Sequence, residues 1–286
     1  MNQFRSIFIV GVLSFFLFGF VNTAKAEKKP RNVMEQKEGY VQVTTHFGFP
    51  VTGDGSGFVS GIGGWYQPFK YLGGGTGFSY LVDQNGNNTV GNVYLDVQTG
   101  VETDEKKDVY AFVHGGVALD FGLYELGQKT KNISLIGRML DQESFRSIEG
   151  KSAIVMPYLS TGFTLGHLIL QGYLSPIFGM PLSDQENRDT AYGVAYRFQI
   201  GTGFGDYRGG LSFLAGAHGL IQLNGDENHY SALDLGTVLY IGSLGLVPYA
   251  TLSIPLSGPS GGVSAVVLVG LSWKFDVQGS PPAEQK

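Results

Sequence analysis

The sequence of 286 residues contains no cysteine, which excludes a disulfide framework and every metal site built on thiolates. Charged side chains are scarce, at 15% of the chain against about 25% in an ordinary soluble domain. The formal net charge is −5, so the chain lacks the basic surface that binding to nucleic acid requires. The five histidines are scattered and form no metal-binding pair. We therefore expect no nucleic-acid partner, no metal ion and no cofactor.

Apolar runs long enough for a membrane-spanning helix are also lacking after the first 26 residues. At the start of the chain, Arg5 precedes an apolar segment from Ile7 to Val21, and Ala24-Lys25-Ala26 follows. A basic start, an apolar core of about 7–15 residues and an A-x-A site are typical of a secretory signal peptide. We predict a signal peptide over residues 1–26 and a periplasmic leader over residues 27–38.

Glycine, by contrast, is abundant, with 44 residues or roughly twice the usual share. Apolar and polar side chains alternate with a period of two through most of the chain after residue 38, which indicates β-strands. The clearest example predicts Val93, Leu95, Val97, Thr99 and Val101 on an outward face, opposite Asn92, Tyr94, Asp96 and Gln98.

The period-two segments number twelve and divide the chain as a transmembrane barrel would. Their approximate ranges are 40–49, 58–66, 72–82, 89–101, 109–121, 153–163, 167–177, 190–202, 207–223, 230–241, 245–255 and 262–275. Bacterial outer-membrane barrels have an even number of antiparallel strands. We therefore predict an all-β fold: a transmembrane antiparallel up-and-down β-barrel of about 12 strands over residues 39–275. A soluble sandwich would not need such long strands or so few charges.

Short and long connections alternate along the predicted barrel. With the N-terminus in the periplasm, short inner turns fall at 67–71, 103–107, 164–166, 203–206 and 242–244. The outer connections are mostly longer, and one, over residues 122–152, is the longest in the chain. Short periplasmic turns with longer external loops are the outer-membrane pattern. A polar C-terminal tail over residues 276–286 follows the barrel.

The last strand carries the most specific signal. Gly270, Trp273 and Phe275 have the spacing of a glycine, an aromatic residue three positions on and a phenylalanine two positions further. This arrangement resembles the C-terminal recognition signal of Gram-negative outer-membrane β-barrels. The resemblance implies location in the outer membrane, contact with its lipids and lipopolysaccharide, and folding by the barrel-assembly machinery.

Aromatic residues near the strand ends predict two interfacial girdles, because such rings anchor barrels at the membrane surface. They are Phe49, Tyr80, Phe121 and Tyr192 on the outer side, with Trp65, Trp273 and Phe275 on the inner side.

The long external segment contains apolar residues at helical spacing. Its position resembles that of the third external loop of porins, which folds into the lumen and narrows it. The resemblance implies a constriction built from Ile133, Ile136, Arg138, Leu140, Asp141 and Arg146. An amphipathic helix that caps the rim or lies on the outer leaflet is the alternative.

Polar residues on the predicted inward faces are candidates for lining a pore. They are His46, Asp96, His114, Asp120, Arg197, His218, Asp234 and Lys274, with Gln199 beside them. Apolar or aromatic inward positions accompany them, namely Tyr94, Tyr110, Phe112, Tyr158, Tyr173, Leu214 and Leu220. Mixed charges and apolar rings favour a narrow pore for a small or hydrophobic solute. A lumen plugged by polar groups that satisfy one another is the alternative.

An enzyme that modifies lipids is a second class of function. His229 and Ser231, near Asp226 and Glu227, are the candidates for a base and a nucleophile at the outer rim. A hydrolase or acyltransferase would need them within hydrogen-bond reach, and no recognisable motif surrounds them. The sequence therefore favours a protein that is not an enzyme. A structural or adhesive barrel with a blocked lumen is the third class.

Overall fold

The computed structural model describes residues 40–52, 58–69, 72–82, 88–102, 109–122, 152–181, 191–206, 209–223, 229–241, 244–257 and 264–276. Nearly all of these residues belong to twelve β-strands, as predicted. The strands are β1 (Tyr40–Thr52), β2 (Phe58–Phe69), β3 (Leu72–Val82), β4 (Asn88–Glu102), β5 (Val109–Gly122), β6 (Ser152–Leu165), β7 (Leu168–Pro181), β8 (Ala191–Asp206), β9 (Gly209–Gln222), β10 (His229–Ile241), β11 (Leu246–Ser257) and β12 (Ala265–Asp276). None of the described segments forms a helix long and apolar enough to cross a membrane.

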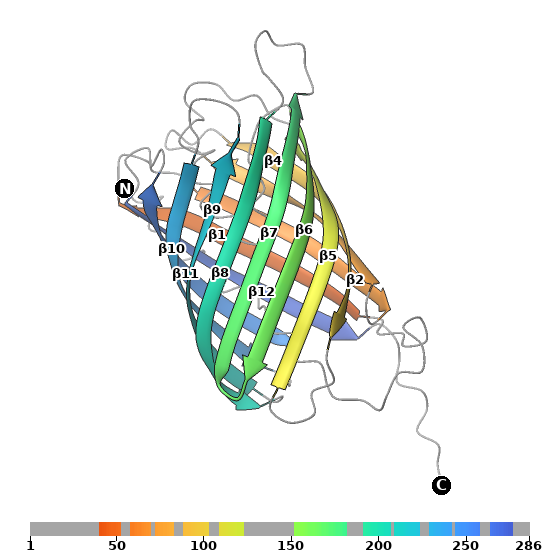
Figure 1. Ribbon diagram of the computed structural model, residues 1–286, viewed down its shortest axis with the longest axis vertical. Coiled ribbons are helices and arrows are strands. Elements are labelled where there is room, and N and C mark those ends of the chain that lie inside the picture. The colour runs from red at the N-terminus through yellow and green to blue at the C-terminus, as the bar shows by residue number, and fades with distance from the viewer. Residues whose placement is uncertain are drawn as a thin grey trace.

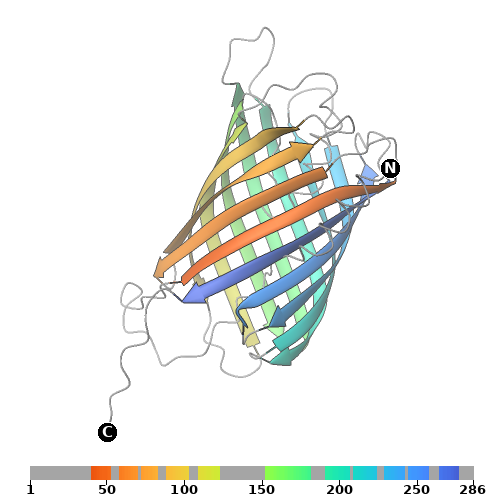
Figure 2. The ribbon, with the colours of Figure 1, turned by 180° about the vertical axis from the view of Figure 1, so that it is seen from behind.

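The strands close into one antiparallel barrel, because each pairs with its sequence neighbours and β1 pairs with β12. At this seam Tyr40 lies opposite Asp276, and Thr44 lies opposite Ser272. Figure 2 shows β1 in red-orange beside β12 in violet-blue, although they come from opposite ends of the chain. Closure leaves no free sheet edge, which is the condition for placing a sheet in hydrocarbon.

Each strand is long enough to cross a bilayer. They range from 11 residues in β3 to 16 in β8, and Figure 1 shows that they are strongly tilted. A tilted strand needs roughly 9–11 residues to cross the hydrocarbon core. The excess length therefore extends the barrel beyond the hydrocarbon core.

The outer face of the barrel is apolar. On β4, Leu95, Val97 and Val101 are 48%, 59% and 62% exposed, while Asn92 on the opposite face is buried. The same alternation exposes Phe198, Ile200 and Phe204 on β8. Burial in lipid would satisfy these side chains, whereas water would not. The predicted outward face of β4 is confirmed.

One predicted turn is wrong. The sequence predicts a turn at 203–206, but β8 continues to Asp206 and pairs there with Gly209 of β9. The backbone N–H of Gly203 donates to the His167 carbonyl at 2.9 Å, and the His167 ring stacks on Phe204. His167 follows Gly166, whose φ of +55° makes the tight turn between β6 and β7. Contacts with this neighbouring turn hold the glycine-rich segment extended.

Several predicted segments lie outside the described residues. These are the signal peptide over 1–26, the leader over 27–38 and most of the external loop over 122–152. The C-terminal tail also lies outside them, apart from Asp276, which is the last residue of β12.

Candidate functional site: the inner wall of the barrel

The predicted pore-lining residues all lie at inward-facing positions of their strands. Asp120, His218 and Asp234 are at most 1% exposed, and His114 and Arg197 are 7% and 6% exposed. His46 and Asp96 are half-buried, and Lys274 is exposed near the end of β12. Gln199 is buried beside Arg197 on β8. Lining of an open pore by these residues stays a prediction.

Six inward-facing rings lie opposite glycines of neighbouring strands, and we call them the glycine-backed rings. A Cβ added at any of these glycines would collide with the ring, so each ring covers the backbone of the neighbouring strand. The pairs are His46 with Gly61, Trp65 with Gly75, Tyr94 with Gly77, His114 with Gly100, Phe112 with Gly162 and Tyr158 with Gly116. Glycine lets a large ring lie along the wall instead of projecting towards the axis.

Trp65 does not belong to the membrane girdle in which the sequence analysis placed it. Its ring also covers Gly73, and its indole N–H donates to the Gln67 side-chain oxygen at 3.0 Å. Trp65 therefore faces the interior. The glycines at positions 73 and 75 on β3 leave room for the ring there, which outweighs the general preference of aromatic residues for the membrane interface.

Four polar or aromatic side chains form one hydrogen-bonded network inside the barrel. The Tyr158 hydroxyl donates to Asp96 Oδ1 at 3.0 Å and also contacts Gln98 Oε1 at 3.3 Å. Gln98 Nε2 lies 2.6 Å from Nδ1 of His114. These bonds join β4, β5 and β6 and fix the ring of Tyr158 in one orientation. The sequence places these residues on inward faces but does not show that they meet.

Five inward-facing rings lie in two groups that together we call the ring ladder: Tyr110, Phe112 and His114 on β5, and Tyr158 on β6 with Tyr173 on β7. Neighbouring ring centroids lie 6.0 Å apart for Tyr110 and Phe112, and 4.7 Å apart for Phe112 and His114. Tyr158 and Tyr173 are stacked with centroids 5.5 Å apart. These are the usual distances of attractive aromatic pairs.

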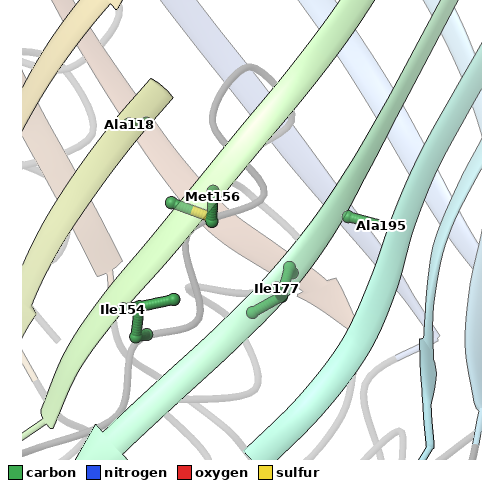
Figure 3. Close-up of a cluster of buried hydrophobic side chains, with 5 residues drawn as sticks. All are labelled: Ala118, Ile154, Met156, Ile177 and Ala195. Atoms are coloured by element: carbon green, nitrogen blue, oxygen red, sulfur yellow. The ribbon is translucent and has the colours of Figure 1, made fainter. Parts of the chain in front are cut away.

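An apolar cluster adjoins the ring ladder. It consists of Ala118, Ile154, Met156, Ile177 and Ala195, which come from β5, β6, β7 and β8 (Figure 3). Tyr158, Tyr173 and Leu220 pack against it. The cluster lies near the end of β5 and the start of β6, so it is at the end of the barrel where the long external segment begins.

A second polar group lies on β8, β9 and β10. His218 Nδ1 lies 2.7 Å from Asp234 Oδ2, and both side chains are almost completely buried. Arg197 is the residue opposite His218 on β8, and the Tyr230 ring lies 5.8 Å from the imidazole. The sequence analysis selected His218 and Asp234 separately, since it had no information on register.

The candidate residues for catalysis are not brought together by any described contact. The Ser231 hydroxyl lies 2.7 Å from the Ser257 hydroxyl across β10 and β11. The side chain of His229, together with Asp226 and Glu227, lies outside what the structure describes. Within the described ranges, no three His, Asp or Glu side chains are arranged to hold a metal ion.

Two other sets of predicted residues have a mixed outcome. All six predicted constriction residues lie in the external segment, outside the described residues: Ile133, Ile136, Arg138, Leu140, Asp141 and Arg146. Of the predicted assembly signal, Gly270 is buried on the inner face and Trp273 is 46% exposed on the outer face. The Phe275 side chain is not among the described parts of the structure. Recognition of this signal by the barrel-assembly machinery stays a prediction.

No protein-family model matches the chain, and no curated protein matches its sequence. An outer membrane channel from Pseudomonas putida F1 is similar in structure, with a TM-score of 0.54 and 12% identity over 87% of this chain and 100% of that one. The β domain of the Bordetella autotransporter BrkA has a TM-score of 0.46 at 12% identity, over 84% of this chain and 100% of that one. A loop-deletion variant of OmpT, an outer membrane protein of Vibrio cholerae, has a TM-score of 0.38 at 11% identity, over 82% of this chain and 98% of that one.

The likeness to the Pseudomonas channel shows the fold that the two proteins share. Together with the closed barrel of twelve strands and its apolar outer face, this identifies an integral β-barrel of the Gram-negative outer membrane.

Proposed function

We infer that the chain forms a narrow channel through which a small or hydrophobic solute crosses the outer membrane. The observation that supports this most directly is the partial exposure of inward-facing side chains, among them Asp96, Gln98, Tyr158 and Tyr173. The outer face of the wall contacts lipid, so the exposed surface of these side chains borders accessible space inside the barrel. Diffusion through such a space requires no cofactor.

The glycine-backed rings support the same function. A barrel of twelve strands lies between small barrels filled by side chains and porins of about 16–18 strands with wide channels. Large rings projecting towards the axis would fill a barrel of this size. Rings lying over Gly100, Gly116 and Gly162 instead take up less of the lumen, and they would give a passage a partly apolar surface.

The external segment over residues 122–152 is the proposed constriction. It connects β5 to β6, and these two strands contribute Ala118, Ile154 and Met156 to the apolar cluster near that end of the barrel. In this proposal Lys131–Glu149 narrows the entrance, so its removal increases permeability. The outer-membrane lipids, lipopolysaccharide and the barrel-assembly machinery remain the proposed partners.

A release assay tests the function. The refolded full chain and a variant lacking Lys131–Glu149 are placed in liposomes loaded with small neutral solutes of graded size. We expect size-limited release by the full chain and a larger size limit for the deletion variant. Folded protein that releases no solute in either form would contradict the channel.

A lipid-modifying enzyme is the second candidate, and phospholipid turnover is measured on the same samples. The observation that favours it is the His218–Asp234 pair, which has the arrangement of a base and its orienting carboxylate. Side-chain exposures of only 1% and 2% leave little room for a substrate to approach, which favours a structural role. Turnover that is lost in His218→Gln would reverse this preference.

A further inference from the structure

We propose that the outer face of the barrel around β9 and β10 binds one ester-linked acyl chain of a phospholipid, whose ester carbonyl accepts a hydrogen bond from Ser231 or Ser257. This inference goes beyond the channel function, because the lipid side of the wall takes no part in passage through the lumen. Two features of this face support it: a pair of hydroxyl groups near the outer rim, and a strip of small side chains that leads away from the pair.

Ser231 and Ser257 form the pair of hydroxyl groups, which we call the hydroxyl pair. The two residues lie opposite each other on β10 and β11, and their hydroxyl oxygens are 2.7 Å apart. Ser231 is close to the start of β10 and Ser257 is the last residue of β11, so the pair lies near the outer rim. Ser231 is two positions from Leu233, which is 37% exposed, and this period of two places the pair on the lipid side.

The hydroxyl pair has one more hydrogen atom than its own contact uses, because two hydroxyl groups carry two hydrogens and one bond joins them. Other hydroxyl groups on the outer face donate to the wall itself. Thr76 donates to the Tyr94 carbonyl at 2.7 Å, and the bond from Thr161 to the Phe112 carbonyl is 3.1 Å long. The described contacts include no such wall acceptor for the hydroxyl pair, so one hydrogen can be donated to a group outside the protein.

The surroundings of the hydroxyl pair indicate which acceptor that is. Leu256, next to Ser257, is 62% exposed, and Ile221 on β9 is 41% exposed. A hydroxyl donor left without a partner among hydrocarbon chains is costly. Ester carbonyls of phospholipids lie where the acyl chains begin, so they are acceptors within apolar surroundings. A phosphate group would instead be bound by cationic side chains, and none is present among the described residues named for this face.

A strip of small side chains leads from the hydroxyl pair towards the middle of the wall. It consists of Ala217 and Ala215 on β9, which follow Gly219, the residue opposite Ser231. Large side chains of the neighbouring strands β8 and β10 lie opposite both alanines and are 37–56% exposed. They are Phe198 and Leu233 beside Ala217, and Ile200 and Leu235 beside Ala215. One acyl chain can lie along the alanines and contact the large side chains on both sides.

Competition between two phospholipids that differ only at the carbonyl tests this inference. The refolded full chain in detergent receives equal amounts of ester-linked and ether-linked phosphatidylethanolamine with the same chain length. Native mass spectrometry then counts the lipids that stay bound. We expect the ester form to be retained roughly threefold to tenfold more than the ether form, as one net hydrogen bond predicts.

Variants locate the bound lipid. Ser231→Ala/Ser257→Ala should remove the preference for the ester form. Thr161→Val is the matched control and should keep the preference, because it removes an outer-face hydroxyl that already donates to the wall. Ala217→Leu places a large side chain in the strip and should lower the retention of both lipids.

Four results would overturn the inference. The first two are equal retention of the two lipids by the full chain and an ester preference that survives in Ser231→Ala/Ser257→Ala. The third is unchanged retention in Ala217→Leu. The fourth is displacement of the ester form by an equal amount of lipopolysaccharide, which would assign the surface to that lipid instead. None of these results depends on whether the barrel conducts ions, so the channel function stands or falls separately.

Discussion

At the scale of single residues, the barrel is organised by pairs of a ring and a glycine. Phe112 and Gly162 are a simple pair, because the three atoms nearest to a Cβ at Gly162 would all belong to the Phe112 ring. Tyr158 adds hydrogen bonds to the same arrangement, since its hydroxyl reaches Asp96 and Gln98. Each ring can therefore lie along the wall because the glycine opposite it has no Cβ.

Gly162→Ala tests this dependence. The added methyl group displaces the Phe112 ring towards the axis, so we expect lower single-channel conductance and a stability loss of about 1–3 kcal/mol from overpacking. Removing the ring in Gly162→Ala/Phe112→Ala should restore the conductance.

Gly115→Ala is the matched control for Gly162→Ala. An added Cβ at Gly115, on the outer face of β5, would lie 3.7 Å from its nearest neighbour, the Tyr158 carbonyl oxygen. It should leave conductance unchanged. Unaltered conductance in Gly162→Ala would show that the Phe112 ring does not limit the passage.

The buried pair of His218 and Asp234 gives a second prediction at this scale. Asp234→Ala leaves the imidazole without its carboxylate in a position that water does not reach, so stability should fall by about 3–5 kcal/mol. Asp96→Ala, at a half-buried site, should cost about 1 kcal/mol. Urea unfolding in vesicles measures both. Similar losses of unfolding free energy at the two sites would mean that burial of the His218–Asp234 pair contributes little to stability.

At the scale of elements, the sequence could predict the strands and their orientation where the two faces of a strand differ in polarity. Period-two alternation identified all twelve strands and the outward face of β4, because lipid and lumen impose opposite requirements on adjacent residues. β11 could not be oriented from its apolar sequence, and the structure buries Tyr249, Thr251 and Ser253 on the inner side.

The errors in the sequence analysis have one physical source. The turn predicted at 203–206 and the outward position of Trp65 were both judged from local sequence. The register between strands decided them instead, since it places Gly203 beside His167 and Trp65 opposite Gly75. The contacts of Tyr158 with Asp96 and of His218 with Asp234 depend on register in the same way, so composition and spacing could not predict them.

Adjacent residues on β9 test the two faces directly. Phe213 is 50% exposed on the outer side, and Leu214 faces inward beside Gly201. Phe213→Arg should cost up to roughly 2–4 kcal/mol, the cost of placing the charge in hydrocarbon, and Leu214→Arg should cost less because the lumen solvates it. The free energy of unfolding in vesicles is the measurement. A larger loss for Leu214→Arg would contradict the assigned faces.

At the scale of the whole molecule, the closure of β1 on β12 makes the barrel continuous. Thr44 and Ser272 lie opposite each other there, and their hydroxyl oxygens are 3.3 Å apart. Because residues at opposite ends of the sequence meet at this seam, one covalent bond across it would convert most of the chain into a closed loop.

The absence of cysteine from the chain makes that bond easy to test. Thr44→Cys/Ser272→Cys should form a disulfide on mild oxidation, visible as altered migration of the heated, denatured protein that reverses on reduction. Thr44→Cys/Ser160→Cys places the second thiol on β6 and should form no intramolecular bond. Cross-linking in the control pair but not across the seam would contradict the strand order.

The most direct test of the whole account is the single-channel conductance of the refolded full chain in a planar bilayer. We predict steady conductance steps of one small size, because the inner wall has exposed polar groups and rings that lie along it. Silence from protein that is demonstrably folded and inserted would contradict the open lumen and favour a barrel whose interior is closed.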